Sequence, residues 1–190
     1  WDLSDARSVG KLGTRPPAVR AATPRQEGGW AAMKSSIQIR DATVDDAPRI
    51  SALLTELAEE FIVRHFTSEG RSHLLAHFGV TEMDERLKAA EYRFRLAEDG
   101  AELVGVVGVR AATHLQYLFV AKSHQRAGLA RRLWELARRD AIRDGNAVGR
   151  FTVNASGYAV PAYERLGFRR VGPVREANGV RFQPMELAGA

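Results

Sequence analysis

The chain has 190 residues, a formal net charge of +5 at pH 7 and no cysteine. This length suits one domain of ordinary size with a short appendage. The lack of cysteine excludes disulfides, thiolate metal sites and a cysteine nucleophile, and no apolar run reaches the roughly 18 residues of a membrane-spanning helix. We therefore expect a cytoplasmic protein without a membrane partner.

The positive charge is unevenly distributed along the chain. Residues 1–36 contain six basic and three acidic side chains, a net charge of +3, which leaves only +2 for the rest. A nucleic-acid-binding domain needs a basic face on its folded part, so we expect no nucleic-acid partner. The N-terminal stretch also lacks apolar periodicity, and Pro16-Pro17 and Gly28-Gly29 interrupt any regular element. We predict a flexible leader over residues 1–35 and a folded domain over residues 36–190.

The folded part begins with a short strand at residues 37–40, in which apolar and polar side chains alternate. Thr43 suits the N-cap of a helix, because apolar side chains then recur at helical spacing from Ile50 to Phe61. Thr81 is the expected N-cap of a later helix. Three helices are therefore predicted in this region, at residues 43–61, 66–78 and 81–90.

After residue 90, apolar side chains recur at every second residue, which indicates strands. Asp99-Gly100 and Asn178-Gly179 predict hairpin turns, and Gly105 and Gly108 within one strand indicate a bulge or a close backbone neighbour. The strands are predicted at residues 92–96, 103–109, 113–120, 148–154, 168–174 and 181–187, with helices that end at Asp144 and Arg165 between them. This order predicts an α+β fold, an α/β/α sandwich whose mixed, mostly antiparallel sheet of about seven strands has helices on both faces.

Residues 115–132 have the pattern of a buried strand, a short polar turn and the start of a helix. The first turn of a helix has free backbone N–H groups and the positive end of the helix dipole, so it can bind an anion. Gly128 lets a phosphate approach the backbone, Ala130 keeps the next position small, and Arg126 and Arg131 add positive charge. This arrangement favours a diphosphate, although many strand–turn–helix units contain a glycine and bind nothing.

Two motifs then carry a resemblance to a known family. Residues 125–130, Gln-Arg-Ala-Gly-Leu-Ala, are similar to the acyl-CoA signature Q/R-x-x-G-x-G/A of the GNAT (Gcn5-related N-acetyltransferase) family. Further along, Asn154 is followed by the family pattern A-x-x-x-Y-x-x-x-G-F at residues 159–168. With this order of elements, residues 37–187 resemble a GNAT N-acetyltransferase. The resemblance implies acetyl-CoA as cosubstrate, a primary amine as acceptor, and direct attack of the amine on the thioester.

The resemblance also implies a cleft between two splayed strands, one that ends at Phe119 and Val120 and one that ends at Asn154. The pantetheine arm would lie there, bonded to main chain near Phe119 and Val120, and a backbone N–H near Val120 would stabilise the oxyanion. Tyr163 would lie near the thioester sulfur and act as general acid for the leaving thiolate. The residues expected to bind the cofactor are Phe119, Val120, Gln125, Arg126, Ala127, Gly128, Leu129, Ala130, Arg131, Asn154 and Tyr163.

The base that accepts the amine proton is not fixed by the sequence. His114 shares a strand face with Gln116 and is a candidate base that would act through a water, although a structural histidine is the simpler interpretation. His73 and His77 lie four residues apart on a helix, where solvent exposure is the simpler interpretation. They lack a third ligand, so we predict no metal site.

The main alternative to an enzyme is a non-catalytic acyl-CoA-binding protein of the same fold that contacts a partner protein. Tyr163 would then be a packed tyrosine whose hydroxyl bonds main chain, and Tyr158 is a second, weaker candidate for the acid. Acceptor specificity is expected from residues 61–80 and from the hairpin at residues 176–182, where nothing in the sequence identifies the amine. A homodimer is one option for the assembly of the chain.

Overall fold

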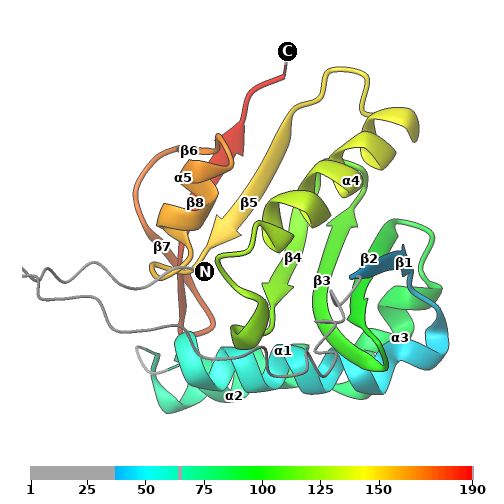
Figure 1. Cartoon of the computed structure of the whole chain (residues 1–190). Helices are drawn as coiled ribbons and strands as arrows, with labels where there is room; N and C mark the ends of the chain where they lie inside the picture. Colours follow the sequence, from blue (N-terminus) through cyan, green and yellow to red (C-terminus); the bar gives the residue numbers. More distant parts are fainter. Residues whose placement is uncertain (1–36, 64–65, 190) are drawn as a thin grey trace, which may run out of the picture.

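A computed structural model of the chain describes residues 37–63 and 66–189, so the predicted leader lies outside the described residues. Within them, eight strands form a mixed sheet with helices on both faces, as the sequence predicts (Figure 1). The strands are β1 (Gln38–Asp41), β2 (Tyr92–Asp99), β3 (Glu102–Arg110), β4 (His114–Val120), β5 (Phe151–Ala155), β6 (Arg169–Arg170), β7 (Arg175–Ala177) and β8 (Val180–Leu187). The helices are α1 (Ala47–Phe61), α2 (Ser68–His77), α3 (Val80–Lys88), α4 (Leu129–Arg143) and α5 (Val160–Arg165), with 3₁₀ turns η1 (Val44–Asp46) and η3 (Lys122–His124).

The strand order is β1-β2-β3-β4-β5-β8-β6, and β7 pairs with β8. In the described part of the chain, β4 and β5 are the one parallel pair, and they are joined at a single register position, His114 with Thr152. Beyond that position the two strands separate, so the sheet opens into a V toward α1 and α2 (Figure 1). The splayed strands implied by the resemblance are therefore present.

Two apolar cores lie on opposite faces of the sheet. On one face, Leu133 and Trp134 of α4 are buried, and the Trp134 ring packs edge-to-face on Phe151 with centroids 5.0 Å apart. On the other face, Leu54 of α1 and Met83 of α3 are fully buried. Because both faces of the central strand β3 are covered, its interior is a continuous apolar run without polar alternation. None of the helices in the described segments has the length and apolarity needed to cross a bilayer.

Gly108 makes room for an aromatic stack beside the V. Phe94 of β2 and Tyr117 of β4 stack with ring centroids 5.5 Å apart. A Cβ at Gly108 would lie 2.6 Å from the Phe94 ring and 2.8 Å from the Tyr117 ring. The register between β3 and β4 also shifts at Gly108 and Val109. The predicted bulge is confirmed, whereas the close neighbours of Gly108 are side-chain rings and not the backbone that the pattern indicated.

One predicted strand starts later than the sequence pattern indicates. The prediction placed it at 148–154, but β5 starts at Phe151 because the Asn146 side chain holds the preceding residues in a turn. Its Nδ2 donates to the carbonyl oxygens of Ala112 and Arg150, each at 2.9 Å. A side chain that satisfies local backbone groups in this way competes with strand pairing.

Two other boundaries also differ from the prediction. The strand predicted at 168–174 is reduced to Arg169–Arg170, because Gly172 has a φ of 72° and interrupts the regular pairing with β8 until Arg175. The helix with the expected cap Thr81 begins at Val80, since the glycine before Val80 is extended and already forms the N-cap. Both differences come from glycines that end or begin an element one or a few residues early.

An ion-pair cluster fixes the start of α1 to the edge of the sheet. The buried carboxylate of Asp46 accepts hydrogen bonds from two nitrogens of Arg40, at 2.7 and 2.8 Å, and from the backbone N–H of Thr43 at 2.8 Å. Arg40 also donates to Glu98 of β2 at 2.9 Å. The hydrogen bonds from Arg40, with a smaller contribution from Thr43, hold the pKa of Asp46 far below its usual range although burial opposes this.

Replacement of Asp46 by asparagine should lower the free energy of unfolding by about 2 kcal/mol at pH 7. This is less than the roughly 3–5 kcal/mol of a fully buried broken pair, because the Arg40 side chain is 38% exposed. Since the folded-state pKa is lowered, the carboxylate stabilises the fold above the unfolded pKa of about 4, and the effect disappears as pH falls through the folded pKa. The difference between wild type and D46N in urea unfolding should therefore shrink below about pH 4.

Asp45→Asn is the matched control, because Asp45 is exposed on the same 3₁₀ turn. It should change the free energy of unfolding by less than about 0.5 kcal/mol. Equal losses in D45N and D46N would show that the pair with Arg40 contributes no stability of its own.

Candidate functional site

The segment between β4 and α4 gathers its backbone N–H groups at one point. Gly128 is the N-cap of α4 with a φ of 81°, and Arg126 is also left-handed with a φ of 65°. Within the described part of the chain, none of the amides of residues 127–131 donates a hydrogen bond. The backbone here alternates between left-handed and right-handed conformations, and its unpaired N–H donors lie at the positive end of the helix dipole. Such an arrangement forms an anion-binding concavity.

Two side chains that are predicted to bind the cofactor form hydrogen bonds to the elements around this concavity. Gln125 Nε2 donates to the carbonyl oxygen of Val120 at 3.0 Å and so fixes the turn to the end of β4. Arg131 Nη2 donates to the carbonyl oxygen of Arg165 at 3.1 Å, at the C-terminal end of α5. These bonds connect the strand, the turn and the short helix, and leave the backbone amides to face a ligand.

A cavity of about 220 Å³ lies over the turn, between the end of β4, the start of α4 and α5. We call it the turn cavity. It brings together eight of the predicted cofactor residues: Val120, Gln125, Arg126, Gly128, Leu129, Ala130, Arg131 and Tyr163. Ala127 belongs to the turn but does not line the cavity. Three arginines and no carboxylate of the described residues line it, which suits a diphosphate.

A second cavity, of about 320 Å³, lies on the other side of the V, beneath α2 and the β7–β8 hairpin. We call it the hairpin cavity. The remaining predicted cofactor residues, Phe119 and Asn154, line this cavity, together with Gln116 and Tyr117 of β4. Tyr163 lines both cavities, so its side chain stands where they meet.

Tyr163 is held by the packing of its ring, and its hydroxyl is unbonded within the described residues. The ring packs edge-to-face on Phe168 with centroids 5.6 Å apart. Within the described segments its hydroxyl makes no hydrogen bond, so the alternative of a tyrosine tied to main chain has no support there. Burial raises the pKa of Tyr163 above its ordinary value of 10.0. The phenol therefore stays protonated at neutral pH and can donate its proton to a group in either cavity.

His114 lies at the paired end of β4, away from the opening of the V. Its Nδ1 is 2.8 Å from the hydroxyl oxygen of Thr152, and it lines neither cavity. Burial, and then the charge of Arg110, lower its pKa. Gln116, on the same strand face, does line the hairpin cavity. A role for His114 as the base stays a proposal, in which water would have to carry the amine proton past Gln116 to His114.

Solvent exposure was the simpler interpretation of His77 from the sequence, but its side chain is half-buried and lines the hairpin cavity. Arg86 donates to its Nδ1 at 2.9 Å, which leaves the proton on Nε2, 3.4 Å from the Tyr117 hydroxyl. Burial lowers the pKa of His77 to about 4. The imidazole ring is therefore neutral at pH 7, but the lone pair on its Nδ1 already accepts the hydrogen bond from Arg86. The sequence had no signal for this arrangement, since Arg86 comes from the next helix.

The other histidines add no metal site. His73 is exposed as expected, and its Nε2 lies 3.3 Å from Asn178 Nδ2. Within the described ranges, no group of three or more His, Asp or Glu side chains could hold a metal ion.

Two glycines allow α2 to cover the hairpin cavity. Asn178 and Gly179 form the predicted turn between β7 and β8, with φ values of 50° and 72°. A Cβ on Gly70 of α2 would lie only 2.1 Å from the carbonyl oxygen of Gly179, so helix and hairpin touch backbone to backbone. Gly70, which weakens the helical pattern in the sequence, is thus the residue that lets α2 approach the hairpin.

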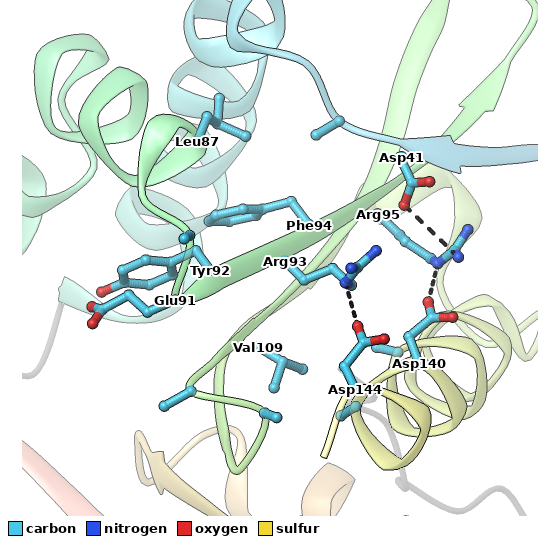
Figure 2. A pocket seen from close by; sticks show the side chains of 16 residues that line it. Asp41, Leu87, Glu91, Tyr92, Arg93, Phe94, Arg95, Val109, Asp140 and Asp144 are labelled. Atoms are coloured by element: carbon cyan, nitrogen blue, oxygen red, sulfur yellow. Dashed lines mark hydrogen bonds and ion pairs between the residues drawn. The ribbon is translucent and has the colours of Figure 1, made fainter. Parts of the chain in front are cut away.

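A larger cavity, of about 480 Å³, lies between β2 and the C-terminal half of α4. Figure 2 shows that Arg93 and Arg95 of β2 point toward Asp144, the C-cap of α4, and Asp140 of α4. Arg93 pairs with Asp144 at 2.8 Å, and Arg95 pairs with Asp140. These ion pairs join β2 to the C-terminal end of α4. No predicted site residue lines this cavity.

Comparisons with known proteins identify the family and agree with the fold. The family model described as an acetyltransferase (GNAT) domain matches residues 62–188. No curated protein sequence matches the chain. Among solved structures, a GCN5-related N-acetyltransferase from Rhodopseudomonas palustris is similar, with a TM-score of 0.69, 18% identity, and coverage of 81% of this chain and 96% of that one.

Two further solved structures have the same fold. The PaiA N-acetyltransferase of Thermoplasma acidophilum, in complex with coenzyme A, has a TM-score of 0.65 and 16% identity, over 80% of this chain and 99% of that one. A GNAT-family acetyltransferase from Streptococcus pneumoniae has a TM-score of 0.59 and 22% identity, over 81% of this chain and 99% of that one. At these identities the similarity establishes the fold.

Proposed function

Because the chain belongs to the GNAT family of acetyltransferases, we propose that it transfers an acetyl group from acetyl-CoA to a primary amine. The observation that carries the proposal is the position of Tyr163 between two cavities of different character. The turn cavity offers unpaired amides and arginines to a diphosphate, and the hairpin cavity offers a mostly apolar space to an acceptor. The similar Thermoplasma acidophilum protein is in complex with coenzyme A, which supports acetyl-CoA as the acetyl donor.

In the proposed reaction, acetyl-CoA is held by the amides of residues 127–131 and by the separated ends of β4 and β5. The amine in the hairpin cavity attacks the thioester carbonyl carbon, so that a C–N bond forms and the C–S bond breaks. The nitrogen releases a proton to solvent water, and Tyr163 donates its hydroxyl proton to the leaving thiolate. The phenolate of Tyr163 then takes a proton back from water, which restores the acid. Phe119 and Asn154 border the acceptor side of this reaction, since both line the hairpin cavity.

The proposal is tested by binding and by turnover. Acetyl-CoA at 100 times its Kd should stabilise the fold by about 2.7 kcal/mol, measured as a rise in Tm. Free thiol should then be released only when an amine is present. The chain has no cysteine, so a thiol reagent reports coenzyme A without a protein background. Binding without release across a broad panel of amines would contradict the proposal and favour the non-catalytic acyl-CoA-binding alternative.

A further inference from the structure

The hairpin cavity has aromatic walls and lacks negative charge. Six phenylalanine and tyrosine side chains line it: Phe66, Phe78, Phe119, Phe182, Tyr117 and Tyr163. No carboxylate of the described residues lines it. A ligand with several ammonium groups would have to leave water without any opposite charge to receive it, which is costly.

The space beyond the hairpin cavity has the same character. A groove of about 550 Å³ adjoins it and shares Ile62, Phe66, Ser156, Arg181 and Phe182 with it. Within the described residues, this groove also has no carboxylate in its lining. The apolar surface therefore continues outward from the cavity, and its charged residues are arginines.

Among the described residues, Arg181 is the cation in this space that lacks a partner. It is exposed on β8, and in the described part of the chain it forms no ion pair or hydrogen bond through its side chain. Glu176 lies opposite it in the hairpin register but lines neither the cavity nor the groove. Arg170, the other arginine of the groove, already pairs with Glu164 at 2.9 Å. A guanidinium binds a carboxylate with two parallel hydrogen bonds, so Arg181 is suited to an anionic group on the acceptor.

We propose that the acceptor is a monoamine with an aromatic or aliphatic body and a carboxylate, and that Arg181 binds this carboxylate. The body lies against the aromatic walls, and the amine faces the junction at Tyr163. This inference rests on the proposed acetyltransferase function. It selects against polyamines and other polycations, because neither the cavity nor the groove offers them a carboxylate among the described residues.

The test compares amines that differ only in the carboxylate. Thiol release is measured with L-phenylalanine and phenethylamine, with 4-(aminomethyl)benzoate and benzylamine, and with spermidine. In at least one of the two pairs, the carboxylated amine should have a kcat/KM roughly 10- to 100-fold higher than its partner. Spermidine should be the poorest acceptor of the five.

Arg181→Gln should remove this preference by lowering kcat/KM for the carboxylated amine roughly 10- to 100-fold while leaving the partner amine unchanged. A merely structural role would lower both rates together. Arg175→Gln is the matched control, since Arg175 is exposed on the same hairpin and lines neither the cavity nor the groove. Arg181→Lys, which keeps the charge but loses the paired donors, should give an intermediate loss.

The outcomes separate this inference from the function on which it rests. Turnover of spermidine at least as fast as that of the carboxylated amines, or equal loss for both members of a pair in R181Q, overturns the inference and leaves the acetyltransferase function in place. Acetyl-CoA binding without thiol release from any amine overturns both.

Discussion

Replacement of Gly128 by glutamate should abolish the stabilisation of the protein by acetyl-CoA. Gly128 caps α4 with a φ of 81°, and a Cβ placed there meets no atom within 4 Å. The side chain therefore meets no steric clash, although the positive φ strains the backbone. Its carboxylate enters the turn cavity beside the amides that we propose for the diphosphate. At a concentration that stabilises wild type by about 2.7 kcal/mol, the rise in Tm should fall below detection, which corresponds to an affinity loss of more than roughly 100-fold.

Two controls separate the charge from the backbone effect. Gly128→Ala has the same left-handed conformation without the charge, so it should lose about 1 kcal/mol of stability and keep most of the ligand-induced shift. Gly172→Glu adds the same charge at a φ of 72°, also in open space, but outside both cavities. It should keep the full shift. A wild-type shift in G128E would mean that acetyl-CoA binds elsewhere on the molecule.

The sequence was most informative where a site is built from neighbouring residues. The turn cavity depends on a strand, a left-handed glycine and a helix start that follow one another within residues 115–132. Local spacing is enough to predict such a unit, and it also predicts the hairpin turn at Asn178-Gly179. The hairpin cavity could not be predicted in this way. It depends on the contact of Gly70 with Gly179 and on the pairing of His77 with Arg86, which only the packed fold brings together.

The alternation of side chains also could not predict where along β4 the pairing with β5 ends. His114 and Gln116 lie on one strand face, as alternation predicts. Only the single register pair of His114 with Thr152 shows that β4 and β5 are still joined at His114 and separate further along. Gln116 therefore borders the hairpin cavity and His114 does not. Side-chain partners are equally hidden, since Gln125 matches the family motif but donates to the Val120 carbonyl.

Tyr163→Phe should lower kcat roughly 100-fold while leaving acetyl-CoA binding intact. The phenol is the one proton donor that we place at the junction of the two cavities, and its hydroxyl makes no hydrogen bond within the described residues. Removal of that hydroxyl therefore takes away the proton for the thiolate without unpairing another group. The melting temperature and its rise with acetyl-CoA should match those of wild type, whereas the rate of thiol release with a good acceptor should fall.

The matched control is Tyr158→Phe, because Tyr158 stacks on Phe61 with centroids 5.2 Å apart and lines the groove outside both cavities. Its kcat should stay within about twofold of wild type. The raised pKa of Tyr163 also fixes the sign of the pH dependence. The protonated phenol is the active form, so its contribution is lost only as pH rises above the ordinary value of 10.0, and the wild-type kcat should show no decline below that pH. An unchanged kcat in Y163F, or equal losses in the two variants, would remove Tyr163 as the acid.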